Sequence, residues 1–151
     1  MLVRSAEILS LMPTAKEDAQ SLVDELMPFA KQMLTTHGEF MPYGGHMKLN
    51  GEIVHEGATT GEERSRSQPL INILRSSHSE AARDGRIRAA CIVYDILIAP
   101  PEQSQKVDAI AFEIDHREEY SAVLFYPYAL SGDEVVFVQA AFGGRGQNAI
   151  F

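Results

Sequence analysis

The chain has a single cysteine, no tryptophan and no long run of hydrophobic residues. One cysteine excludes an intrachain disulfide and any zinc site built from several thiolates. Because a membrane helix needs about 20 consecutive apolar residues, none is predicted. Basic residues are also scarce, since 13 Lys and Arg stand against 21 Asp and Glu and the formal net charge is -8. This balance does not attract phosphate backbones or anionic membranes, so neither nucleic acid nor a membrane is an expected partner.

The composition is that of an ordinary globular domain. Hydrophobic residues make up 45% of the chain and charged residues 23%, and 151 residues are enough to bury one core. We therefore predict a single domain over residues 1–151, with residues 1–13 loosely ordered. The first residues carry Arg4 and then Glu7 inside the stretch that a signal peptide keeps apolar. The sequence thus predicts a cytoplasmic protein.

Two helices are predicted from their ends and their apolar periodicity. Thr14 and Glu17 have the spacing of a capping box, which begins a helix. Apolar side chains then recur three and four positions apart, and Gly38 suits the left-handed C-cap position. A second stripe of this kind begins near Ser67 and ends at Asp84-Gly85.

The remaining segments are predicted to be strands. Between the helices, Asn50-Gly51 is a strong hairpin signal, and it pairs residues 40–49 with 52–56. After the second helix come four apolar runs, at residues 87–99, 107–116, 120–128 and 135–142. The order is helix, β-hairpin, helix and four strands. Short connections between the last four favour an antiparallel meander, so the fold class is α+β, with the sheet curled or paired across a dimer.

These four runs are apolar at both parities, although successive side chains of a strand point to opposite faces. The parity with larger side chains is predicted to be the core face: Ile92, Tyr94, Ile96, Ile98, Ile110, Phe112, Ile114, Leu124, Tyr126, Tyr128, Val136, Val138 and Phe142. The other parity is smaller: Cys91, Val93, Asp95, Leu97, Ala109, Ala111, Glu113, Asp115, Ser121, Val123, Phe125, Val135, Phe137, Gln139 and Ala141. If the two helices cover the first face, the second must line a cavity or dock on another subunit.

The second face carries the candidate site residues. Carboxylates among small apolar side chains have raised pKa values where water is excluded, and such groups can act as a general base or bind a cation. Asp95 is the main candidate because an aspartate in mid-strand needs a partner, for which Arg88 is the structural alternative. The full set is Asp95, Glu113, Asp115 and Gln139, with Tyr94 and Tyr43 expected nearby.

The predicted hairpin contains two histidines. With a two-residue turn, His46 lies directly opposite His55, and such positions hold their Cβ atoms about 4.5–5.5 Å apart. The two imidazoles would bind one divalent metal if His37, Glu39 or Glu56 supplied a third ligand. The simpler interpretation is a polar pair on a solvated face, so no metal and no cofactor is predicted.

Two resemblances accompany these patterns. The segment HGEFMPYG at residues 37–44, with Asn50-Gly51-Glu52 after it, resembles a pattern in small bacterial proteins of similar length, and this resemblance implies no activity. The order of elements is similar to the cone-shaped α+β folds of the nuclear-transport-factor-2 type, which implies a curled sheet over a cavity. This second likeness concerns architecture only.

Two functional hypotheses follow. The first is a non-catalytic binding or interaction domain of a soluble bacterial-type protein, homodimeric through its sheet surface or a sheet edge. Its acidic charge would suit a basic protein partner. The alternative is a small-ligand-binding protein or small enzyme with a pocket on the second sheet face, in which Asp95 and Glu113 serve as acid or base. Tyr43, His46, His55, Tyr94 and Gln139 are the candidate binding residues.

Overall fold

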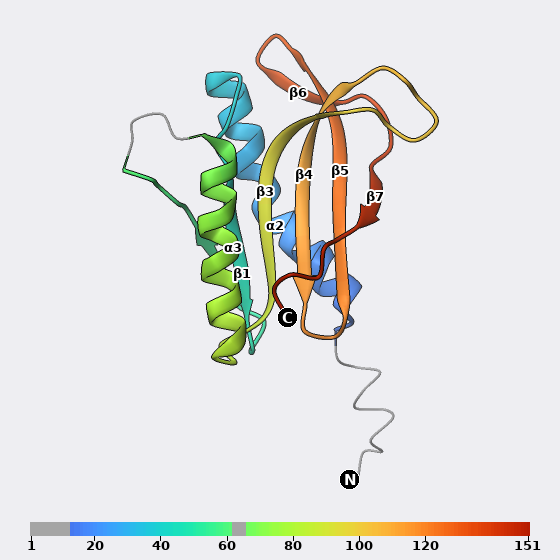
Figure 1. The fold of residues 1–151 in the computed structure, drawn as a ribbon. Helices are drawn as coiled ribbons and strands as arrows, with labels where there is room; N and C mark the ends of the chain where they lie inside the picture. Colours follow the sequence, from blue (N-terminus) through green and yellow to red (C-terminus); the bar gives the residue numbers. More distant parts are fainter. Residues whose placement is uncertain (1–12, 62–65) are drawn as a thin grey trace, which may run out of the picture.

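The computed structural model describes residues 13–61 and 66–151 (Figure 1). The predicted loose N-terminal segment therefore lies outside the described residues, apart from Pro13. Within the described part, no helix has both the length and the hydrophobicity needed to span a bilayer.

The first helix, α2, spans Ala15–His37, as its capping box predicts. The Glu17 amide donates to the Thr14 hydroxyl at 3.1 Å, and the Thr14 amide donates to the Glu17 carboxylate at 3.3 Å. Gly38 ends the helix with a φ of 74°, a conformation that glycine adopts without steric cost. The apolar stripe forms most of the buried face, namely Ala19, Leu22, Val23, Leu26, Ala30 and Leu34, to which Asp18 adds one charged side chain.

The second helix, α3, spans Ser67–Arg83, also as predicted. No side chain caps its N-terminus at Arg66, and its end is followed by Gly85 with a φ of 67°. The buried face of α3 consists of Leu70, Ile71, Leu74, His78 and Ala81. Four of these five are apolar, so His78 is the one polar side chain that this helix buries in its contact with the sheet.

The strands of the described residues form one open antiparallel sheet of seven strands. They are β1 Tyr43–Lys48, β2 Ile53–Glu56, β3 Ile87–Ile98, β4 Val107–His116, β5 Tyr120–Ser131, β6 Glu134–Phe137 and β7 Phe142–Arg145. The order is β2-β1-β3-β4-β5-β6, and β7 also pairs with β5. The fold is α+β as predicted, but the last predicted strand is two strands, β6 and β7, which pair with different halves of the long β5.

The hairpin of β1 and β2 has a different register from the predicted one. His46 lies opposite Val54, and His55 lies opposite Gly45. The Gly51 amide donates to the Lys48 carbonyl at 2.9 Å, and Gly51 has a φ of 91°, so the loop contains a β-turn followed by a left-handed glycine. This loop is one residue longer than the two-residue turn. The shift moves His46 and His55 to opposite faces, so the prediction that they are adjacent is wrong.

The two helices cover opposite faces of the sheet, which differs from the prediction that they share one. A Cβ on Gly45 would lie 3.0 Å from Leu26 of α2, whereas a Cβ on Gly44 would lie 3.5 Å from Leu74 and His78 of α3. Because these glycines are consecutive in β1, they face opposite sides. Figure 1 shows α2 crossing behind the strands and α3 lying along β1 and β3 in front.

The register of β3 against β4 assigns the faces of β3 differently from the prediction. Val93 lies opposite Phe112, and both belong to the core under α2. Cys91 is fully buried in the same core, as expected. Ile92 lies opposite Glu113, which places both on the α3 face. Asp95 and Glu113 are therefore on opposite faces of the sheet. The prediction that they act together on one substrate as acid and base is wrong.

The chain after β7 covers part of the α3 face. Ile150 is buried with Ala81 of α3 and with Ile87 and Ala90 of β3. The Asn148 amide donates to the Ser121 hydroxyl at 3.0 Å. In Figure 1 this segment crosses in front of the strands. The second face is therefore covered along β3 by α3 and by this C-terminal segment.

Candidate functional site

A pocket of about 480 Å³ lies at the end of the sheet next to the C-terminus of α2. Asp95 and Tyr128 lie in this pocket, which we call the Asp95 pocket. Its lining residues are Gly38, Asp95, Val107, Asp108, Tyr128, Ala129, Leu130 and Val138. The sequence predicted Asp95 in a pocket on the second sheet face, whereas this concavity lies on the α2 face.

The carboxylate of Asp95 is half-buried and surrounded by negative charge. Burial raises its pKa, a hydrogen bond from the Tyr128 hydroxyl at 2.9 Å lowers it, and the charges of Asp108 and Glu39 raise it further, so that it stands above the usual value. Burial and the Asp95 charge also raise the pKa of Tyr128. Because Gly38 lines the pocket, the negative end of the α2 dipole lies beside it.

Among the described residues, no basic side chain balances the charge of this pocket. Within the described residues, Asp95, Asp108 and Glu39 form no ion pair. Arg88, the predicted structural partner of Asp95, instead donates to Asp18 Oδ1 at 2.8 Å. The Asp95 pocket thus has carboxylates and lacks a cation.

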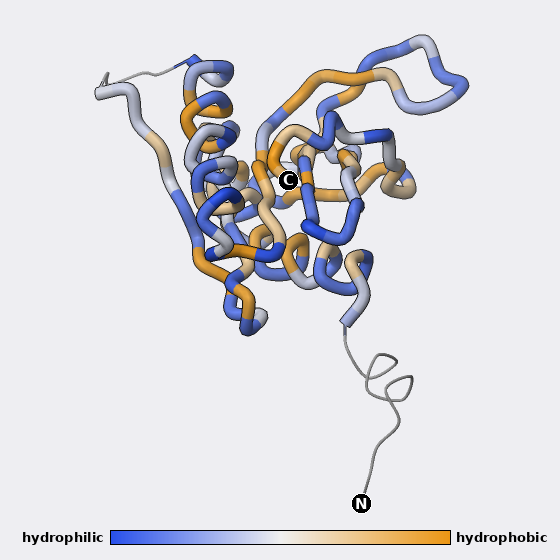
Figure 2. The backbone as a smooth tube through the Cα atoms, turned by 60° about the horizontal axis from the view of Figure 1, so that its bottom comes forward, coloured by the Kyte–Doolittle hydropathy of each residue, from blue (hydrophilic) through white to orange (hydrophobic). Residues whose placement is uncertain are grey.

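The rim of the pocket is apolar and exposed. Leu130 and Val138 line it and are 42% and 49% exposed. Leu97, opposite Asp108 in the sheet, is 58% exposed. Figure 2 shows the hydrophobic end of β3 leading into the hydrophilic loop before β4. The acidic pocket is therefore surrounded by an apolar surface that solvent reaches.

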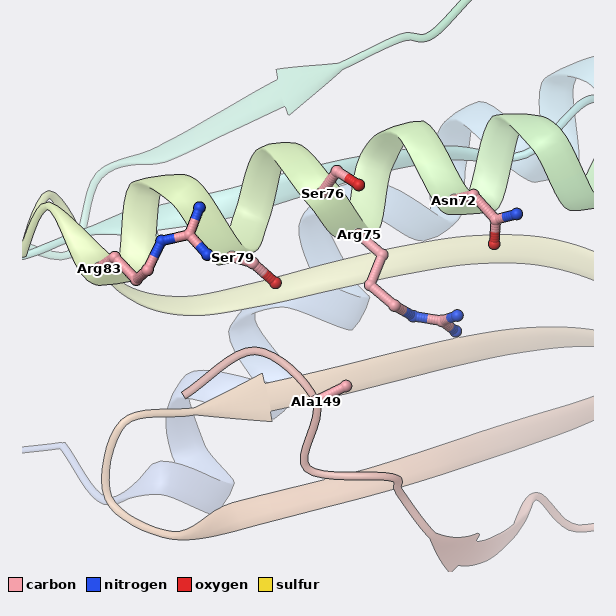
Figure 3. Close-up of a pocket in the computed structure, with 6 residues that line it drawn as sticks. All are labelled: Asn72, Arg75, Ser76, Ser79, Arg83 and Ala149. Carbon is pink, nitrogen blue, oxygen red and sulfur yellow. The ribbon is translucent and has the colours of Figure 1, made fainter.

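A second concavity, which we call the α3 groove, lies on the other face of the sheet (Figure 3). Its volume is about 430 Å³. The residues that line it are Asn72, Arg75, Ser76, Ser79, Arg83 and Ala149. The groove therefore runs between α3 and the C-terminal segment and is lined by two guanidinium groups, two hydroxyl groups and an amide.

Arg75 is oriented by two of the predicted site residues: Glu113 binds it directly, and Tyr94 binds Glu113. Its Nη2 donates to Glu113 Oε1 at 2.8 Å, and the Tyr94 hydroxyl donates to Glu113 Oε2 at 3.5 Å. Burial and the Glu113 charge raise the pKa of Tyr94 to about 12, so the phenol stays protonated. The buried Nε of Arg75 has no hydrogen-bond partner among the described residues. Glu113 and Tyr94 thus orient Arg75, a residue that the sequence did not single out.

The histidines of the hairpin have separate partners. His46 Nδ1 and His78 Nε2 lie 3.0 and 2.8 Å from the same oxygen of Glu56. His55, on the other face, lies 3.1 Å from Glu25. Burial raises the pKa of Glu56, but the hydrogen bonds from the two histidines outweigh it and leave that pKa below the usual value. Within the described ranges no three His, Cys, Asp or Glu side chains are grouped to hold a metal ion.

The two remaining predicted binding residues lie apart from both concavities. Tyr43 is buried under α2, where its hydroxyl donates to the Leu26 carbonyl, and it borders a smaller pocket of about 230 Å³ beside Phe29. Gln139 follows β6 and accepts a hydrogen bond from Gln103 at 3.1 Å. The structure therefore brings Tyr94 to Glu113 and does not bring Tyr43 or Gln139 to Asp95.

No protein-family model, curated protein or solved structure matches the chain. The two resemblances stated from the sequence stay predictions.

Proposed function

We propose that the protein is an interaction domain that binds a basic segment of a partner protein at the Asp95 pocket. The observation that supports it is the half-buried Asp95 carboxylate, which has acidic neighbours and no basic partner in the described residues. Holding such a charge away from water lowers stability unless a cation compensates it. A lysine or arginine from a partner would supply that cation.

The shape and the rim of the pocket support a lysine or arginine side chain. Such a side chain lays its aliphatic stem on apolar surface and extends its charge beyond it. Leu130 and Val138 would contact the stem, and Asp95 and Asp108 would face the charge. A charged pair that apolar contacts shield from water is typical of the residues that dominate binding energy in protein interfaces.

The charge of the whole chain supports the same partner. The net charge of -8 attracts a basic protein from a distance and raises its rate of association. The negative end of α2, at Gly38, adds to the attraction close to the pocket. We therefore expect the rate of association to fall as salt screens these charges.

Asp95→Asn tests this proposal directly, because the asparagine oxygen still accepts from Tyr128 but carries no charge. The probe is a peptide with one lysine flanked by leucines, and calorimetry on the full chain measures its binding. Loss of one partner of a shielded pair is expected to weaken binding at least about 30-fold. Asp133→Asn, an exposed position outside the pocket, is the control and should bind normally.

Two results would contradict the proposal. One is equal binding of the peptide by the parent chain and Asp95→Asn. The other is equal binding of a second peptide in which glutamine replaces the lysine, because recognition would then not depend on the cation.

The stability of the same variant separates a binding role from a structural one. Because the pKa of Asp95 is higher in the folded chain than in the unfolded one, its ionisation destabilises the fold at neutral pH. Asp95→Asn should therefore raise the melting temperature at pH 7, and the gain should shrink as the pH falls towards the usual carboxyl value of 3.8. A lower melting temperature at pH 7 would instead indicate that the charge stabilises the fold.

A further inference from the structure

The α3 groove has a charge pattern opposite to that of the rest of the molecule. Two arginines line it in a chain of net charge -8, and the polar groups beside them are neutral. We infer that the groove binds a small oxyanion, a phosphate or carboxylate group, between Arg75 and Arg83. This site is on the other face of the sheet from the Asp95 pocket and does not depend on the function proposed there.

Arg75 is already oriented for such a ligand. Glu113 accepts from one of its nitrogens, and Tyr94 donates to the other oxygen of Glu113. A guanidinium has five N–H donors, and Glu113 engages only Nη2, so the Nη groups of this partly exposed side chain keep donors for a ligand. Because the side chain is fixed before the ligand arrives, binding costs little conformational entropy. Figure 3 shows Asn72, Arg75 and Ser79 extending from the side of α3 that faces β3.

The helix repeat places the second arginine along the same face. Arg75, Ser79 and Arg83 are four residues apart, so the backbone positions of the two arginines are about 12 Å apart along the axis, with the serine between them. Long side chains at that separation can reach one ligand from both ends. In the described part of the chain Arg83 forms no ion pair, so its charge is available to the groove.

The carboxylates beneath the groove cancel only part of this charge. Glu113 balances Arg75, which leaves Arg83 as the net positive group. Asp115 is buried, and the Ser121 hydroxyl donates to it at 2.7 Å under the C-terminal segment. Burial also raises the pKa of Asp115. The surface that a ligand meets is therefore formed by guanidinium, hydroxyl and amide groups, which are the usual donors to oxyanions.

The experiment is an NMR titration of the full chain with inorganic phosphate and, separately, with acetate. Sodium chloride at matched ionic strength corrects for screening. We expect the Arg75 Nε–H resonance to shift and saturate with at least one of the two anions, and the responding anion identifies the class. Arg83→Gln should weaken this binding about tenfold, which corresponds to one lost charged contact. Arg86→Gln is the matched control, because Arg86 is exposed at the same end of α3 and pairs with Asp84.

A double variant tests Arg75 without leaving an unpaired buried charge. Arg75→Gln alone would leave Glu113 buried without its partner, so Arg75→Gln is combined with Glu113→Gln. This variant lacks the Arg75 resonance, so the backbone amide of Ser79, which also lines the groove, is followed instead. Its shift with the anion in the parent chain should be abolished in the double variant. The proposal is overturned if neither anion gives a saturable shift beyond that of chloride, or if Arg83→Gln and Arg86→Gln weaken binding equally. Asp95→Asn should leave the titration unchanged, so failure at one site does not imply failure at the other.

Discussion

Gly44 and Gly45 allow a helix to approach each face of β1. The space differs between them, because a Cβ on Gly44 would lie 2.7 Å from the Cys91 carbonyl oxygen, whereas a Cβ on Gly45 has its closest contact, at 3.0 Å, with the flexible end of Leu26. A backbone atom in the centre of a sheet has little freedom to move. Gly44 is therefore the position in β1 where a side chain is least compatible with the fold.

Gly44→Ala should destabilise the protein by about 1–3 kcal/mol, the usual result of forcing a methyl group into a packed core. The measurement is the urea concentration at half-unfolding. Gly57→Ala is the control, since no atom lies within 4 Å of its Cβ position, and it should change stability by less than about 0.5 kcal/mol. Equal effects at the two positions would show that the contact with Cys91 does not limit the fold.

The two hydrogen-bond partners of Asp18 are far from it in the sequence. It is in the first turn of α2, and it accepts from Arg88 of β3 and from His116 of β4, each at 2.8 Å. All three side chains are largely buried, with exposed fractions of 16% or less. A buried charge with two donors is satisfied, so Arg88 is not available to Asp95.

The hairpin and α3 are joined through one carboxylate. Glu56 of β2 accepts from His46 of β1 and from His78 of α3, and all three groups are on the same face. His78 is 1% exposed, so this contact is shielded from water. Glu56 therefore connects the edge of the sheet to the helix that covers it.

Glu56→Gln should destabilise the protein by about 2 kcal/mol at pH 7, because hydrogen bonds to a charged group are stronger than those to an amide. The folded pKa of Glu56 is lowered, so its contribution is present above the usual value of 4.5 and is lost as the pH falls through the folded value. Unfolding curves at several pH values test this. The difference from the parent chain should disappear in acid, while Glu52→Gln, 59% exposed, should show little effect at any pH. A difference independent of pH would contradict the assigned charge.

At the scale of the whole molecule, β2 is an edge strand of the sheet. It lies next to the small pocket beside Phe29 and Tyr43. Phe29 is 44% exposed there and packs against Tyr43, with ring centroids 4.8 Å apart. Pairing of two β2 edges across a twofold axis would bury both aromatic surfaces. The Asp95 pocket suits a second copy less well, because an identical surface would bring acid against acid. The predicted homodimer is therefore best proposed at the β2 edge.

We predict that sedimentation equilibrium finds a dimer at micromolar concentrations and that Phe29→Ala shifts it to monomer. Leu97→Ala, at an exposed leucine of β3 away from the β2 edge, is the control. Because each copy carries a charge of -8, salt should strengthen the dimer, whereas it should weaken binding of a basic partner. A monomer at every concentration and salt level would remove the homodimer from consideration.

The helices and most of the strands could be predicted from the sequence because their signals are local. The Thr14–Glu17 capping box and Gly38 define α2 by contacts within a few residues, and the periodicity of α3 needs no knowledge of what it covers. Asp95 was also recognised locally, as an acid in the middle of an apolar strand. Its partner was predicted incorrectly, because Arg88 binds Asp18, a residue 70 positions away from Arg88, and the Tyr128 hydroxyl donates to Asp95 instead.

The faces of the sheet and the contents of the sites were decided by tertiary structure. Because helices or the C-terminal segment cover both sides, β3 is apolar at both parities, and its periodicity cannot show which parity meets α2. The left-handed Gly51 shifted the hairpin by one residue and separated His46 from His55. The last apolar run became two strands, which pair with different halves of the long β5. Arg75 met Glu113 only because α3 packs on the face opposite α2, and this packing depends on the summed burial of many side chains rather than on any short motif.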